Sequence, residues 1–206
     1  MFKRVVLAAL VASLVVPLAA QAPAGWKMRL DRSKSAQDPD DKSGVTFMAM
    51  GKAFHVVGGP AGVYWNPSMT AAGNYTLKGT FTLLKPSNHT NYYGLVFGGS
   101  NLDAPTQAYA YFVIAQNGMF LVRHNQGGNA TDVVRRATNA AVRQPGADGK
   151  SSNSLEVRVA GDTVSYVVNG TVVHSGPKGG LMTDGLVGVR VNHVLDVQFE
   201  GFEVGK

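Results

Sequence analysis

Two tyrosines and a histidine lie at spacings along one segment of the chain that could bring them to one strand face. The segment YAYFVIAQNGMFLVRH runs from Tyr109 to His124, and Asn117-Gly118 separates two strand-like runs within it. An Asn-Gly pair between such runs predicts a two-residue hairpin, which would place Tyr109, Tyr111 and His124 on one face. Pyranose C–H faces stack on aromatic rings, and sugar hydroxyls take directional hydrogen bonds. We therefore predict a saccharide platform on this face.

Four further residues are candidate partners for a sugar at this platform: Asp103, Asn192, His193 and Trp65. Trp65 follows Tyr64 in GVYWNP, and neighbouring strand residues point to opposite faces, so we expect one of these two rings to be exposed. The alternative interpretation of the platform is a central strand that is buried on both faces. In that case Tyr109 and Tyr111 would be core residues.

The nearest match to a catalytic carboxylate set is LDVQFEGFE, in which Asp196 and Glu200 share a strand face and Glu203 follows Gly201. Retaining glycosidases need two carboxyl groups about 5–5.5 Å apart, whereas strand residues i and i+4 are roughly 13 Å apart. We favour the solvent-exposed face of a strand, with a β-bulge at Gly201. The sequence has no Gly-x-Ser-x-Gly elbow either, so we assign no catalytic residue.

Metal and cofactor sites are not expected. The histidines lack the spacing of a metal motif, and there is no cysteine. Residues 31–44, DRSKSAQDPDDKSG, have no periodicity and are expected to form a flexible loop. Calcium is the less favoured alternative for Asp38, Asp40 and Asp41, because Lys42 stands where a third oxygen ligand is needed.

The N-terminus reads MFKRVVLAALVASLVVPLAAQAPAG, an apolar run after Lys3 and Arg4 that ends in small residues. This pattern predicts a signal peptide over residues 1–24, of a bacterial type, and a single domain over residues 25–206. The absence of cysteine excludes both disulfides and a lipid-acceptor thiol. We expect an exported periplasmic or extracellular protein without a membrane anchor.

Charge gives no indication of nucleic-acid binding. Lysine and arginine number 19 against 13 aspartates and glutamates, and this excess is spread along the chain, with Arg135-Arg136 as the basic doublet after the N-terminal Lys3-Arg4. Nucleic-acid-binding proteins concentrate such charge on one face or in a recognisable module. We therefore expect no nucleic-acid partner, and the sequence leaves the oligomeric state open.

Period-2 alternation dominates the chain after residue 44, and no segment shows a convincing helical period. Asn74–Leu84 is the clearest strand, with Leu77, Phe81 and Leu83 on one face. A second Asn-Gly pair, Asn169-Gly170 in TVSYVVNGTVVHS, predicts a type I′ hairpin. Many short strands with glycine-rich turns predict an all-β, two-sheet antiparallel jelly-roll sandwich.

Five segments in this order carry a family resemblance: NYTLKGTFTLLKP, NYYGLVFGG, YAYFVIAQNGMFLVR, SLEVRVAGDTVSYVVNGTVVHS and GLVGVRVNHVLDVQFEGFEV. Together they resemble the concanavalin A-like lectin/glucanase superfamily and, within it, bacterial exported domains of the 3-keto-disaccharide hydrolase type. The resemblance covers about residues 44–204 and implies a two-sheet jelly roll.

These observations favour a non-catalytic carbohydrate-recognition module whose partner is a glycan or oligosaccharide. The resemblance implies an alternative, a glycoside hydrolase acting on a disaccharide or keto-sugar. A second alternative is a structural or protein-interaction module. A hydrolase needs two carboxyls that converge in a cleft, a lectin needs an aromatic ring beside amides, and an interaction module needs a flat apolar patch.

Overall fold

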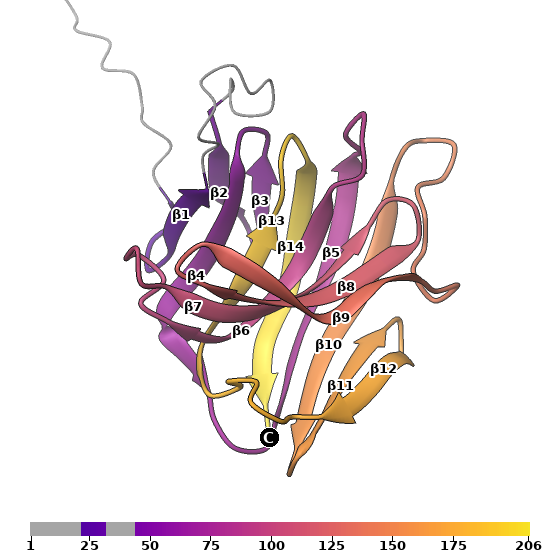
Figure 1. The fold of residues 1–206 in the computed structure, drawn as a ribbon. Helices are drawn as coiled ribbons and strands as arrows, with labels where there is room; N and C mark the ends of the chain where they lie inside the picture. The colour runs from indigo at the N-terminus through magenta and orange to yellow at the C-terminus, as the bar shows by residue number, and fades with distance from the viewer. Residues whose placement is uncertain (1–21, 32–43) are drawn as a thin grey trace, which may run out of the picture.

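The computed structural model describes residues 22–31 and 44–206, which form two seven-stranded antiparallel sheets (Figure 1). Sheet A has the order β1 (Lys27–Asp31), β4 (Ala61–Ala71), β13 (Gly185–Val191), β6 (Tyr92–Ser100), β7 (Ala108–Ala115), β8 (Met119–Gln126) and β9 (Asn129–Thr138). Sheet B has the order β12 (Thr171–Pro177), β11 (Thr163–Val168), β10 (Ser151–Ala160), β5 (Tyr75–Lys85), β14 (Asp196–Gly205), β3 (Ala53–Val57) and β2 (Thr46–Met50).

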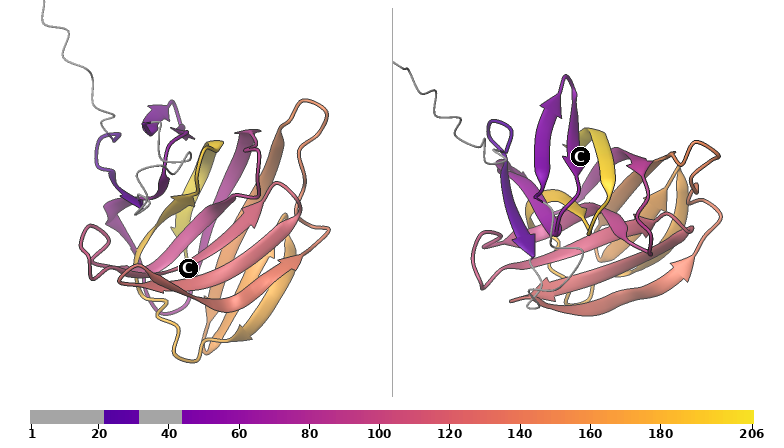
Figure 2. Two further views of the ribbon diagram at one scale, coloured as in Figure 1. Left: turned by 45° about the horizontal axis from the view of Figure 1, so that its top comes forward. Right: turned by 90° about the horizontal axis from the view of Figure 1, so that it is seen from above.

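The jelly-roll prediction is confirmed, because the two sheets pack face to face (Figure 2). The described residues include no helix, and hence none that could cross a membrane. The predicted strand Asn74–Leu84 corresponds to β5, and its Leu77, Phe81 and Leu83 are fully buried between the sheets. Phe81 of sheet B meets Tyr93 of sheet A with ring centroids 6.1 Å apart, so aromatic contacts join the two layers.

The Asn169-Gly170 turn forms as predicted. Both residues have positive φ, 49° and 81°, as a type I′ turn requires, and Val168 pairs with Thr171. A bulge between Tyr166 and Val167 then shifts the register. Tyr166 therefore faces His174, whereas the two-residue hairpin alone would have paired it with Val173.

The Asn117-Gly118 turn differs from its prediction. Strand β7 ends at Ala115 and β8 begins at Met119, so the connection has three residues, and among them only Gly118 has a positive φ, 81°. The extra residue shifts the register by one position, and Tyr111 pairs with Arg123. His124 consequently lies on the opposite face from the tyrosines, and the predicted trio does not form.

Other sequence predictions have mixed outcomes. The bulge at Gly201 is confirmed by a φ of 59° and a register shift between Glu200 and Glu203. Asp31, placed in the loop by the sequence, is the last residue of β1. The predicted signal peptide, except its last residues from position 22, and positions 32–43 of the predicted loop lie outside the described residues, as do the aspartates considered for calcium.

Candidate functional site

The outer face of sheet A, turned away from sheet B, carries a second cluster of buried side chains. We call it the outer cluster; it comprises Val63, Trp65, Tyr92, Val96, Leu102, Tyr109, Tyr111, Val113, Ala115 and Leu121. Their strand neighbours Tyr64, Phe97 and Phe112 belong to the interior core instead. Sheet A is therefore apolar on both faces, as a central sheet with a covered or ligand-binding outer face would be.

Both platform tyrosines are buried in this cluster. Tyr109 is 0% exposed and Tyr111 6% exposed, so the alternative of a strand buried on both faces is correct in its geometry. The expectation that Trp65 or Tyr64 would be exposed is wrong, because they are 2% and 0% exposed. Tyr64 packs in the core between the sheets and Trp65 packs in the outer cluster, so both faces of β4 are covered at this point.

A pocket of about 220 Å³ opens on the outer cluster, and its lining joins four strands and two loops. The lining residues are Thr90, Tyr92, Tyr111, Val113, Leu121, Arg123, Arg136 and Asn192. Apolar floor residues, aromatic rings and polar groups thus meet at one place. Such a combination is characteristic of small-molecule sites, and the volume is below the roughly 300–1,000 Å³ of drug-sized ligands.

Arginine side chains fix the rings of this pocket. The guanidinium of Arg136 lies 5.5 Å from the centroid of Tyr92, and that of Arg190 lies 5.1 Å from the centroid of Tyr111. These distances are within the range of cation–π attraction. Arg123 donates from Nε to Oδ1 of Asp132 at 2.6 Å.

The side-chain oxygen of Asn192 is a buried polar atom of the pocket. The backbone N–H of Asn192 donates to the carbonyl oxygen of Tyr92 at 2.9 Å, which holds the residue beside β6. Its side-chain Oδ1 is buried and accepts no hydrogen bond within the part of the chain that is described. Buried polar atoms normally have partners, so this acceptor can take a hydroxyl donor from a ligand.

A charged network continues the outer face toward β1. Arg190 and Arg29 bind the two oxygens of Asp31, at 2.7 and 2.9 Å, and both donate to the Tyr109 hydroxyl. Burial raises the pKa of Tyr109, so the phenol stays neutral and accepts these bonds. At the end of the network Asp103 forms an exposed ion pair with Lys27 at 3.1 Å.

Two predicted site residues lie away from the pocket. His124 faces the interior side of sheet A, and its Nε2 is buried without a hydrogen bond to any described residue. His193 follows Asn192 in the turn between β13 and β14, and its carbonyl oxygen accepts from Nδ2 of Asn91 at 2.9 Å. His193 is thus adjacent to the pocket in sequence but is not among its lining residues.

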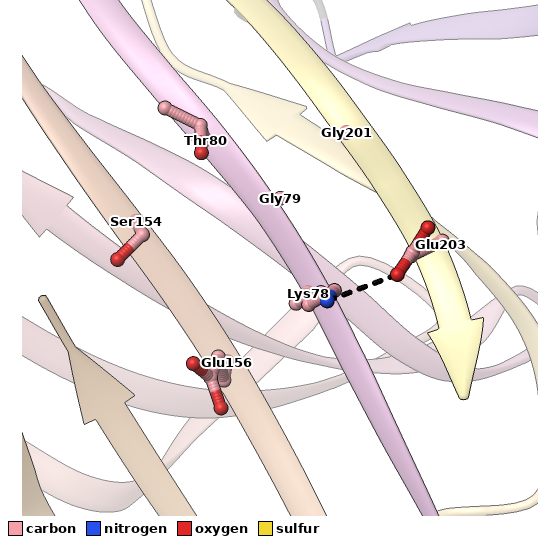
Figure 3. Close-up of a pocket in the computed structure, with 7 residues that line it drawn as sticks. All are labelled: Lys78, Gly79, Thr80, Ser154, Glu156, Gly201 and Glu203. Atoms are coloured by element: carbon pink, nitrogen blue, oxygen red, sulfur yellow. Dashed lines mark ion pairs between the residues drawn. The ribbon is translucent and has the colours of Figure 1, made fainter. Parts of the chain in front are cut away.

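A second hollow lies on the outer face of sheet B. It has a volume of about 290 Å³ and is lined by Lys78, Gly79, Thr80, Ser154, Glu156, Gly201 and Glu203 (Figure 3). We call it the sheet B groove. Lys78 pairs in register with both Glu156 and Glu203, and its Nζ lies 3.0 Å from Glu203. A cation therefore separates the two carboxylates.

Two of the carboxylates singled out on β14 have separate basic partners. Asp196 lies at the start of the strand, where its Oδ1 is 2.6 Å from Nε2 of His55. Glu203 pairs with Lys78 beyond the bulge. No group of three His, Cys, Asp or Glu side chains that could hold a metal occurs in residues 22–31 and 44–206.

Solved structures share this architecture. Carbohydrate binding module CBM66 from Bacillus subtilis aligns over 88% of this chain and 96% of its own, with TM-score 0.64 and 12% identity. A Bacillus subtilis protein with a galectin-like fold aligns over 87% and 88%, with TM-score 0.63 and 14% identity. A GH16 protein from the Bacteroides ovatus mixed linkage glucan PUL aligns over 84% and 92%, with TM-score 0.55 and 9% identity.

The chain has the concanavalin A-like fold. At such low identities the likeness concerns the fold alone. No protein-family model matches the chain, and no curated protein matches it.

On this concanavalin A-like sandwich, sequence reasoning found part of the candidate site and missed its charged members. Tyr111 and Asn192 line the pocket, and Tyr109 and Trp65 belong to the outer cluster around it. Residues that were missed are Arg29, Asp31, Arg123, Arg136 and Arg190. Arg123 is two residues from Leu121 on β8, so both side chains lie on one face, and this spacing was the signal that could have found Arg123. Placing that face beside Tyr111 required the correct hairpin register.

Proposed function

We propose that the protein is an exported, non-catalytic carbohydrate-recognition module that binds a glycan in the pocket beside Tyr111. One observation carries the proposal: a buried, unsatisfied amide oxygen of Asn192 shares a pocket with fixed aromatic rings and guanidinium donors. Rings supply apolar contact and the amide orients hydroxyls, as sugar recognition requires. The fold is compatible, since one similar structure is itself a carbohydrate binding module.

A glycan-array screen with and without calcium, followed by calorimetry on the strongest ligand, tests this function. We expect Asn192→Ala to weaken binding about 10-fold, which corresponds to the loss of one well-formed hydrogen bond. Ser154→Ala is the matched control, because Ser154 lines the sheet B groove instead. An equal loss in both variants, or no ligand on a broad array, would contradict the proposal.

The hydrolase alternative has weaker support. Within residues 22–31 and 44–206, no aspartate or glutamate lines the pocket beside Tyr111, and Lys78 separates the carboxylates of the sheet B groove. A glycosidase acting on a disaccharide or keto-sugar needs two carboxyls placed around the scissile bond. Release of reducing sugar from a bound oligosaccharide by the purified protein would decide for this alternative.

A further inference from the structure

We propose that the pocket beside Tyr111 selects a saccharide that carries an acidic group, carboxylate or sulfate, and that Arg136 recognises this group. The inference rests on the proposed glycan-binding function and specifies its ligand class. It begins from the charge of the pocket lining, which, among the described residues, includes two guanidinium groups, Arg123 and Arg136, and no acidic side chain.

The two arginines differ in their partners. Arg123 is neutralised by Asp132, whose Oδ1 lies 2.6 Å from Nε. Arg136 lies over the Tyr92 ring and forms no ion pair with any residue of the described part of the chain. A guanidinium presents planar pairs of N–H donors that match the paired oxygens of an acidic group. Arg136 is therefore the uncompensated cation of the pocket.

The charge excess extends over the outer face of sheet A. Asp31 is shared by two arginines, Arg29 and Arg190, so one of these cations has no counter-charge of its own among the residues that the structure describes. Together with Arg136, the face has an excess of two positive charges among its ion-paired and pocket-lining groups. A surface of one sign attracts ligands of the other and raises their rate of association.

The remaining lining residues suit the sugar ring that would carry the acidic group. Val113 and Leu121 provide an apolar floor, and Asn192 offers its buried acceptor to a hydroxyl. Thr90 adds a hydroxyl that already accepts from Nδ2 of Asn117 at 3.1 Å. Acidic recognition at Arg136 and hydroxyl recognition at Asn192 thus act on one ligand from two positions of the pocket lining.

Calorimetry with three probes tests the proposal: tetragalacturonate, its fully methyl-esterified neutral form, and a sulfated galactan tetrasaccharide without carboxylates. We expect the protein to bind at least one acidic probe about 10-fold more tightly than the neutral ester, because a bidentate ionic contact is lost in the ester. Arg136→Gln should remove that preference. Arg135→Gln makes the same charge change on the preceding residue of β9, which does not line the pocket, and should alter affinity less than about 2-fold.

Each other outcome overturns the inference in a recognisable way. If neutral and acidic probes bind equally and Arg136→Gln has no effect, the glycan function stands and the acidic selectivity falls. If both arginine variants weaken binding equally, the effect is general charge attraction and Arg136 is no recognition residue. If neither these probes nor any glycan on the array binds, the proposed function itself is wrong.

Discussion

Arg190 on β13 lies over the ring of Tyr111 on β7, with its guanidinium carbon 5.1 Å from the ring centroid. Strand β6 separates these two strands in the sheet, and the β6 residue paired with Arg190 is Gly94, which has no side chain. The contact therefore spans a whole strand. It fixes one aromatic wall of the pocket before any ligand arrives, and a wall fixed in advance reduces the entropic cost of binding.

Asp31 anchors this arrangement and provides the first prediction. Asp31→Asn should lower the free energy of unfolding by about 1–3 kcal/mol, because Arg29 and the mostly buried Arg190 lose their shared counter-charge. Asp103→Asn removes the same charge from an exposed ion pair with Lys27 and should cost less than about 1 kcal/mol. Urea unfolding of both variants measures the difference, and equal costs would contradict the role of Asp31.

Two asparagines, Asn153 on β10 and Asn169 in the turn after β11, are hydrogen-bonded to each other. Asn153 is fully buried; its side chain binds the backbone N–H and carbonyl of Arg143 and accepts from Nδ2 of Asn169 at 2.8 Å. Asn153→Ala leaves these groups unpaired and should destabilise the protein by about 2–3 kcal/mol. The neighbouring Ser152→Ala, on the exposed face, should change stability by less than about 0.5 kcal/mol. Thermal melts that fail to separate the two variants would refute this assignment.

The Asn169-Gly170 turn gives a backbone prediction. Gly170 has a φ of 81°, where a β-branched residue is strained, so Gly170→Val should cost about 1–3 kcal/mol. Gly180→Val is the control, since Gly180 has no left-handed φ and an added Cβ would meet no atom within 4 Å. If chemical denaturation shows both variants at wild-type stability, the strain argument fails.

Export is tested on the N-terminus of the secreted protein. We expect the mature chain to begin between Gln21 and Gly25, because the apolar run ends in small residues there. Intact-mass measurement of the protein from the periplasm or medium of a bacterial host checks this. Folded extracytoplasmic protein that retains Met1–Ala20 would contradict the proposed signal peptide.

The fold could be predicted from sequence because alternation and turn residues are local signals. Leu77, Phe81 and Leu83 share a parity on β5, and that parity alone identifies the buried face. The two Asn-Gly turns show the limit of such signals. The same dipeptide forms a two-residue turn at Asn169-Gly170 but part of a three-residue turn at Asn117-Gly118, and the difference depends on how the flanking strands pair in the sheet.

The candidate site was harder to predict for the same reason. A shift of one residue in the β7–β8 register replaces His124 by Arg123 beside Tyr111, and this changes the chemistry of the face from imidazole to guanidinium. Arg190 reaches Tyr111 from a strand 79 positions away in the chain, a relationship that no local pattern encodes. Asn192, which was among the predicted partners, directly follows β13, a position from which a side chain can turn toward a ligand.

Chemical-shift mapping of isotope-labelled protein, titrated with the strongest array ligand, tests the central claim of glycan binding on sheet A most directly. We expect the perturbed signals to include the backbone amides of Tyr111 and Arg123 and the side-chain amide of Asn192. The signals of the backbone amides of Lys78 and Thr80, in the sheet B groove, should keep their chemical shifts. Perturbations confined to that groove, with the pocket beside Tyr111 unchanged, would contradict the account.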